Sequence, residues 1–210
     1  MNITHINEAI NNLSKARHIF HSEADFQFAF AWELQKVLPQ AEIRLEYCPV
    51  YAKDMHIDIY VIENGETYPI ELKYKTKKIQ TIDNTDYFSL KNHGAQDINR
   101  YAFLYDIKRI ESMKNFDKHF VSGYAIMLTN ESSYWKKSLK ENSIDAAFKI
   151  YEGKEVTGGL SWSDDAGAGT KKGHEKPIEL QGKYTMHWQN FSYIPETKNG
   201  TFMINVVEVK

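Results

Sequence analysis

Apolar and polar residues alternate most regularly between residues 56 and 73. Two runs rich in β-branched and aromatic residues flank Asn64-Gly65, and Asn-Gly between such runs is the strongest short-range signal for a β-hairpin with a two-residue turn. The turn fixes the register, because side chains alternate with a period of two. The predicted pairs are Glu63–Glu66, Ile62–Thr67, Val61–Tyr68, Tyr60–Pro69, Ile59–Ile70, Asp58–Glu71, Ile57–Leu72 and His56–Lys73.

The two faces of this hairpin differ in polarity. We expect Ile57, Ile59, Ile70 and Leu72 to be buried together on the apolar face. The other face carries acidic residues directly opposite each other, in a non-hydrogen-bonded pair whose Cα atoms lie roughly 4.5 Å apart.

Helical spacing is present on both sides of the hairpin. Residues 3–20 predict an amphipathic helix. A second helix is expected to begin at Ser22, with Asp25 completing a capping box, and to be largely buried up to Pro39. A third helix is predicted over residues 94–113.

Further strands are predicted over residues 42–47 and 121–129. The first extends the hairpin into an antiparallel meander. The second follows a helical crossover and should return parallel to the hairpin strand. We therefore expect an α/β fold with a mixed sheet flanked by helices, whose core spans residues 22–130.

The remaining segments are less regular. Residues 79–93 and the glycine-rich residues 163–177 predict loops, the latter either a surface insertion or a mobile flap. A short helix is expected at residues 130–135. Strands at residues 146–151, 178–188 and 202–209 are expected to extend the sheet as a C-terminal β-rich elaboration, residues 131–210.

Composition and charge narrow the class of protein. The 210 residues are 42% hydrophobic and 13% aromatic, which suits a single globular domain, residues 1–210. The formal net charge of −2 argues against nonspecific coating of nucleic acid but allows a local basic groove. One cysteine, no signal-peptide pattern and no apolar run of about 20 residues predict a cytoplasmic protein without membrane contact.

Candidate chemistry centres on the acidic pair of the hairpin. Asp58 and Glu71 repel each other unless a cation lies between them, and oxygen ligands suit Mg²⁺ or Mn²⁺. Lys73 lies on the same face, two residues beyond Glu71. Such a set can bind a metal and stabilise a pentavalent phosphate. The alternative is an acidic, solvated sheet face.

Asp58 followed by Glu71-Leu72-Lys73 on the next strand resembles the PD-(D/E)XK nuclease superfamily. Ile57, rather than proline, precedes Asp58, which departs from the pattern. The resemblance implies a restriction-endonuclease-like fold and a metal held by Asp58, Glu71 and the Leu72 carbonyl. It also implies that Glu23, rather than Glu33, completes the metal site from the preceding helix.

Each of the other candidate site residues has a functional and a purely structural interpretation. Glu23 also suits the first turn of a helix as a favourable charge. Gln96 resembles a glutamine beside the active site of some superfamily members, but an exposed glutamine explains it equally well. The alternating lysines after the hairpin either contact a nucleic-acid backbone or form a solvated face; they are Lys75, Lys77 and Lys78.

The sequence therefore predicts a metal-dependent endonuclease, with DNA favoured over RNA as substrate and a homodimer left open. The competing hypothesis is a non-catalytic nucleic-acid-binding or protein-interaction module that kept the nuclease fold. No P-loop, Gly-x-Ser-x-Gly or Rossmann pattern supports other chemistry.

Overall fold

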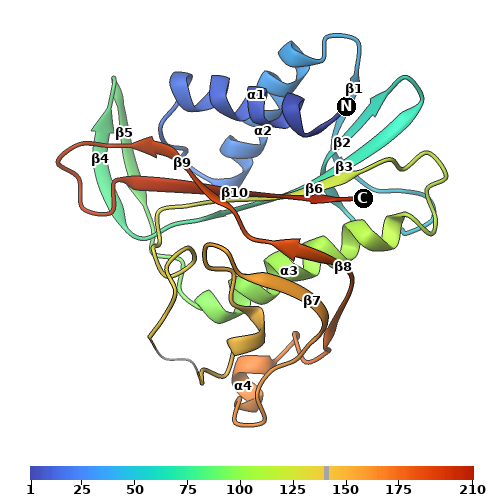
Figure 1. The fold of residues 1–210 in the computed structure, drawn as a ribbon. Helices are drawn as coiled ribbons and strands as arrows, with labels where there is room; N and C mark the ends of the chain where they lie inside the picture. Colours follow the sequence, from blue (N-terminus) through green and yellow to red (C-terminus); the bar gives the residue numbers. More distant parts are fainter. Residues whose placement is uncertain (140–141) are drawn as a thin grey trace.

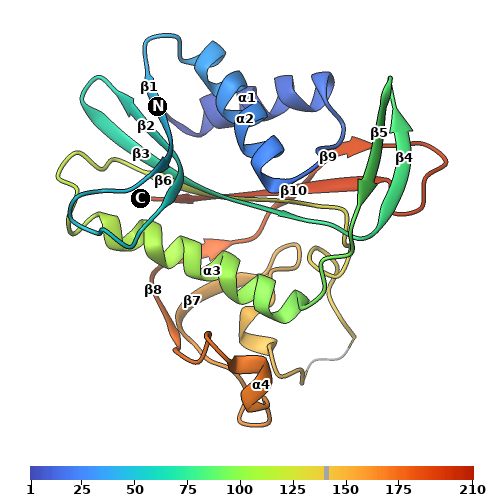
Figure 2. The same ribbon diagram turned by 180° about the vertical axis from the view of Figure 1, so that it is seen from behind.

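A computed structural model describes residues 1–139 and 142–210. Its centre is a six-stranded mixed sheet, with helices α1 and α2 on one face and helix α3 on the other (Figures 1 and 2). The strand order is β1 (Glu42–Tyr47), β2 (Ile57–Glu63), β3 (Glu66–Lys75), β6 (Gly123–Thr129), β10 (Thr201–Val209) and β9 (Trp188–Tyr193). The predicted mixed α/β architecture is confirmed at this level.

The predicted helices form, with small shifts at their ends. α1 spans Ile3–Ala16, α2 spans Glu23–Val37 and α3 spans Gln96–Met113. Ser22 caps α2, because its side chain accepts a hydrogen bond from the Asp25 amide at 3.1 Å. The expectation that α2 is largely buried is wrong for one face, since Phe28 and Trp32 are 56% and 70% exposed. The opposite face alone packs on the sheet and α1.

The hairpin register is confirmed from Glu63–Glu66 to Ile59–Ile70. In the described strands the β2–β3 ladder stops there, so the predicted direct pairing of Asp58 with Glu71 is not part of it. β3 continues instead along β6, to which it is parallel from Ile70 to Lys75. The predicted parallel return strand is thus confirmed.

Two large hydrophobic clusters fill the spaces on either side of the sheet. Ile59, Ile70 and Leu72 pack toward α1 and α2 as expected. Ile57 is also buried, but it belongs to a small third cluster with Tyr60 and Met113. The prediction that Ile57 shares the face of Ile59 is therefore wrong, and the change occurs where β2 separates from β3.

The structure corrects the prediction of a loop after the central hairpin. Residues 79–93 contain a β-hairpin rather than a plain loop, formed by β4 (Ile79–Asp83) and β5 (Asp86–Leu90). This hairpin escaped prediction because only Ile79, Phe88 and Leu90 are buried.

The C-terminal part extends the central sheet only through β9 and β10. β8 (Ile178–Thr185) instead pairs with β7 (Glu155–Leu160) in a separate ribbon. The strand expected at residues 146–151 contains a 3₁₀ turn, η1 (Ala146–Phe148), and the helix expected at residues 130–135 is a series of turns. The segment over residues 163–177 includes the short helix α4 (Ala168–Lys171). Across residues 1–139 and 142–210, none of the helices combines the length and hydropathy needed to cross a bilayer.

Candidate active site

The candidate site lies where β2 and β3 separate. In place of a neighbouring strand, side chains accept hydrogen bonds there from alternate backbone amides, two in β3 and one at Thr76, which directly follows it. The amide of Leu72 donates to Asp58 Oδ2 at 2.5 Å, that of Tyr74 to Glu23 Oε2 at 2.7 Å, and that of Thr76 to His93 Nδ1 at 2.9 Å. Because buried amides must be paired, these three acceptors let the strand edge open without leaving unsatisfied groups.

Helix α2 holds the opening from one side. Glu23 and Gln27 lie one turn apart on this helix and therefore on the same face. Gln27 Nε2 donates to the backbone oxygen of Asp58 at 2.6 Å and to Glu46 Oε1 at 2.7 Å. Gln27 is buried, and the sequence pattern did not single it out.

Helix α3 covers the site from the other side with two charged residues, Asp106 and Arg109. The ammonium of Lys73 lies 2.7 Å from Asp106 Oδ2. The Arg109 guanidinium lies 3.2 Å from Glu71 Oε1 and 3.6 Å from Asp106 Oδ1. Glu71 is 3% exposed and Asp106 is 4% exposed, so both carboxyl groups are held in the interior beside two protein cations.

Burial shifts the titration of the carboxyl groups. It raises the pKa of Asp58 to about 6, against the opposing effects of the Leu72 amide and the Lys73 charge. Burial and the neighbouring Asp106 raise the pKa of Glu71. Burial also raises the pKa of Asp106, despite Lys73 and Arg109. Each group therefore ionises less readily than an exposed carboxyl group, even with Lys73 or Arg109 close by.

The pKa of the Lys73 ammonium is set by burial and by its acidic neighbours. Burial alone lowers it, but Asp106, together with Asp58 and Glu23, outweighs burial and the resulting pKa is raised. Lys73 is consequently protonated at neutral pH. Its ammonium also donates to the Leu72 carbonyl at 3.2 Å.

The structure brings four of the predicted site residues together. Asp58, Glu71, Lys73 and Glu23 influence one another electrostatically at the strand opening. Gln96 lies elsewhere, in the first turn of α3, and its ten-residue separation from Asp106 corresponds to about 15 Å along the helix. The helix contributes Asp106 and Arg109 instead.

The predicted nucleic-acid lysines have different environments. Lys75 is paired with Glu23 at 3.0 Å, and Lys77 with Glu131 at 3.1 Å. Lys78 is exposed. Two of the three lysines therefore already have carboxylate partners.

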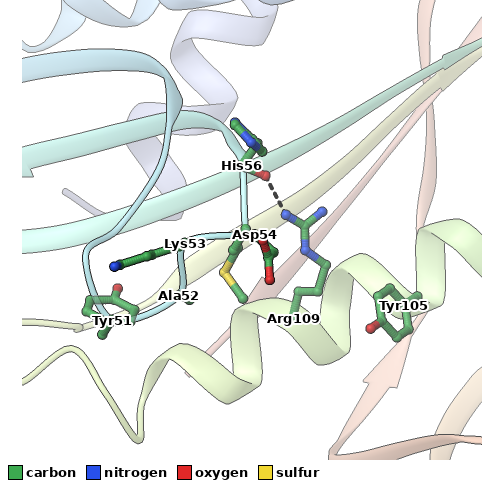
Figure 3. Close-up of a pocket in the computed structure, with 8 residues that line it drawn as sticks. Tyr51, Ala52, Lys53, Asp54, His56, Tyr105 and Arg109 are labelled. Carbon is green, nitrogen blue, oxygen red and sulfur yellow. Dashed lines mark hydrogen bonds between the residues drawn. The ribbon is translucent and has the colours of Figure 1, made fainter.

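Two cavities open beside α3. The first, of about 730 Å³, lies between α3 and the loop over residues 51–56, where Arg109 reaches toward the His56 backbone oxygen (Figure 3). The second, of about 500 Å³, lies between α3 and residues 173–176, and Lys73 and Asp106 form part of its wall. Tyr105 lines both cavities.

The oxygen donors at the opening are the carboxylates of Asp58 and Glu71 and the carbonyl of Leu72. This donor set suits a hard divalent cation. Because Glu71 is buried, its charge is poorly solvated, and a cation beside it would make its ionised form more favourable. Within the described ranges 1–139 and 142–210, no three histidine, cysteine, aspartate or glutamate side chains are arranged as a metal-holding group.

No protein-family model matches the sequence, and no curated protein shows a significant match to it.

Proposed function

We propose that the protein is a divalent-metal-dependent endonuclease on a restriction-endonuclease-like fold, with DNA as the favoured substrate. One observation carries the proposal: Asp58, Glu71 and Lys73 gather at the point where adjacent strands of a mixed sheet separate. The sequence resemblance to PD-(D/E)XK nucleases concerns the same three residues.

The carboxyl groups have the roles of ligands in this proposal. Asp58, Glu71 and the Leu72 carbonyl would hold Mg²⁺ or Mn²⁺, which supplies a Lewis acid that activates water and neutralises phosphate charge. Glu23 would orient a water or help to hold a second ion, after giving up its contact with Lys75. The raised pKa values of Asp58 and Glu71 support a nearby cation, because it would relieve the cost of ionising buried carboxyl groups.

Lys73 has the role of a fixed positive charge. Because Asp106 keeps its pKa raised, Lys73 is unsuited to removing a proton from water at neutral pH. Its ammonium instead would stabilise the negative charge that develops on the phosphate oxygens. Asp106 positions Lys73 through their ion pair.

The rival function is a non-catalytic nucleic-acid-binding or interaction module. The observation that favours it is the pairing of Glu71 with Arg109 and of Asp106 with Lys73. Carboxylates balanced by protein cations are stable without a metal. In that case the fold would present Lys78 and the cavities beside α3 as a binding surface.

A cleavage assay separates the two functions. Pure protein is incubated with supercoiled plasmid in Mg²⁺ or Mn²⁺, and a reaction with excess chelator serves as the negative control. We expect nicking that Asp58→Asn abolishes and that Asp86→Asn, a change of an exposed aspartate on β5, leaves intact. Failure of the wild type to cut double-stranded, single-stranded or branched DNA, or RNA, would support the binding module.

A further inference from the structure

The second cavity beside α3 has the chemistry of a nucleotide pocket. Its volume of about 500 Å³ lies within the range of roughly 300–1,000 Å³ that is usual for small-ligand sites. Aromatic rings and charged side chains line it together, and its three lysines outnumber its two carboxylates, Asp106 and Glu175. The residues used in the argument below are Tyr101, Tyr105, Lys73, Lys108, His174 and Lys176.

The outer wall of this pocket is anchored to the helix. The Tyr101 hydroxyl donates to the backbone oxygen of Lys176 at 2.9 Å, and Trp162 Nε1 donates to that of His174 at 2.8 Å. The rings of Tyr101 and His174 meet edge to face at 5.1 Å. Residues 174–176 are therefore held opposite α3, and the pocket is formed before any ligand binds.

Tyr105 offers the pocket an accessible aromatic surface. It is 41% exposed, and its ring lies nearly parallel to that of the buried Tyr101, at an interplanar angle of 10°. The Lys108 ammonium lies over the Tyr105 ring, 5.6 Å from its centre. A base that stacks on this face would displace the ammonium, which could then pair with the phosphate of the same nucleotide.

The size of the pocket limits what it can hold. A cavity of about 500 Å³ suits a small ligand. A base within a duplex is stacked and paired, so it cannot enter such a pocket unless it is turned out of the helix, whereas an unpaired nucleotide can enter directly. Lys73 on the pocket wall places such a nucleotide next to the candidate site.

We propose that this pocket binds one unpaired nucleotide, with its base stacked on Tyr105 and its phosphate directed toward Lys73 and Lys108. This inference deepens the proposed function and rests on it for the position of the scissile bond. It assigns the substrate class: single-stranded nucleic acid, or a strand whose base is turned out of the helix.

Binding without cleavage tests the pocket directly. The affinities of a fluorescein-labelled ten-residue oligothymidylate and of a blunt 20-base-pair duplex are measured by anisotropy in excess chelator. We expect the single strand to bind more tightly. Tyr105→Ala should weaken single-strand binding on the order of 10-fold or more, whereas Tyr105→Phe, which keeps the ring, should bind like the wild type.

The matched control is Tyr87→Ala, because Tyr87 is an exposed tyrosine on β5, outside both cavities. Equal affinities of Tyr105→Ala and Tyr87→Ala, or tighter binding of the duplex, would overturn the inference. Circular dichroism of each variant shows whether a loss of binding reflects unfolding, and Tyr105→Phe must then retain binding for the inference to hold.

The two proposals fail in different ways. If the protein binds the oligonucleotide through Tyr105 but cuts no substrate, the nucleotide pocket is supported and the nuclease function is rejected. If the protein cleaves plasmid but its affinity for single strands does not depend on Tyr105, the nuclease function is supported and the nucleotide pocket is rejected.

Discussion

Lys73 and Asp106 form an ion pair of 2.7 Å between strand β3 and helix α3. Their side chains are only 16% and 5% exposed, so the pair is largely desolvated. It fixes the ammonium beside Glu71 and Asp58 and keeps it charged. The candidate chemistry of the strand therefore depends on a residue of the helix.

Removing the ammonium tests its role in catalysis. Lys73→Ala retains Asp58 and Glu71, and we expect it to lower the single-turnover cleavage rate on the order of 10² to 10³-fold while DNA affinity falls only modestly. If the protein is a binding module, the substitution will appear only as a salt dependence of binding that is smaller by about one ion. Quenched-flow cleavage and filter binding on one labelled DNA distinguish these results.

The same ion pair should contribute to stability. Lys73→Met leaves the Asp106 carboxylate buried beside Arg109 alone, and we expect it to cost about 3–5 kcal/mol of unfolding free energy in urea. Lys183 and Glu155 form a pair of equal length, 2.7 Å, on the surface. Lys183→Met should change stability by less than about 1 kcal/mol. Similar losses in the two variants would contradict the desolvated character of the Lys73 pair.

Metal binding should be visible in thermal unfolding. Because a ligand that binds the folded state stabilises it by mass action, Mg²⁺ or Mn²⁺ should raise the Tm of the wild type. Asp58→Asn should raise the Tm of the metal-free protein and remove most of the metal-dependent increase. Asp86→Asn should respond to metal like the wild type. Identical metal responses in all three proteins would eliminate the site.

The pKa of Asp58 predicts a pH dependence of stability. Its folded value of about 6 lies above the unfolded value of about 3.9, so the contribution of Asp58 is full below about pH 4 and is lost as the pH rises through 6. Between pH 4 and 7 the metal-free wild type should lose about 2 kcal/mol relative to Asp58→Asn. Chemical denaturation measures the free energy of unfolding of both proteins at each pH. If the two free energies change with pH in the same way, the pKa of Asp58 is not raised in the folded state.

If Glu71 binds a metal, Arg109 should compete with that metal for the carboxylate. Arg109→Met removes the guanidinium from Glu71 and Asp106 and should lower metal-free stability by about 1–3 kcal/mol. It should also enlarge the increase in Tm on adding Mg²⁺, since the carboxylates then lack their protein cation. A smaller increase in scanning calorimetry would mean that Arg109 supports the metal site rather than opposing it.

Local rules were sufficient to predict the hairpin. Asn64-Gly65 determines the turn, and the register of five pairs from Glu63–Glu66 to Ile59–Ile70 follows from it. The separation of the strands beyond Ile59 depends on the parallel pairing of β3 with β6 and on acceptors from α2, which are tertiary features. The gathering of Asp58, Glu71 and Lys73 could thus be predicted, but not the hydrogen bond from the Leu72 amide to Asp58.

The contribution of α3 could not be predicted from its own pattern. Its helical span was expected, but which residues face the site depends on the rotation of the helix against the sheet. Gln96 was chosen by resemblance and lies in the first turn, while Asp106 and Arg109 face β3. The sequence did contain one indication of this: Asp106 is a charged residue close to the apolar Leu104 and Ile107, which are buried.

The open edge of β3 has a further consequence for self-association. An unpaired strand edge is a template on which another chain can add a strand. The carboxylates of Asp58 and Glu23 occupy the Leu72 and Tyr74 amides and place negative charge along this edge, so they exclude a foreign backbone. Replacing both residues with alanine would therefore leave the Leu72 and Tyr74 amides free to pair with a strand of another molecule. Light scattering should then show aggregation of the double variant.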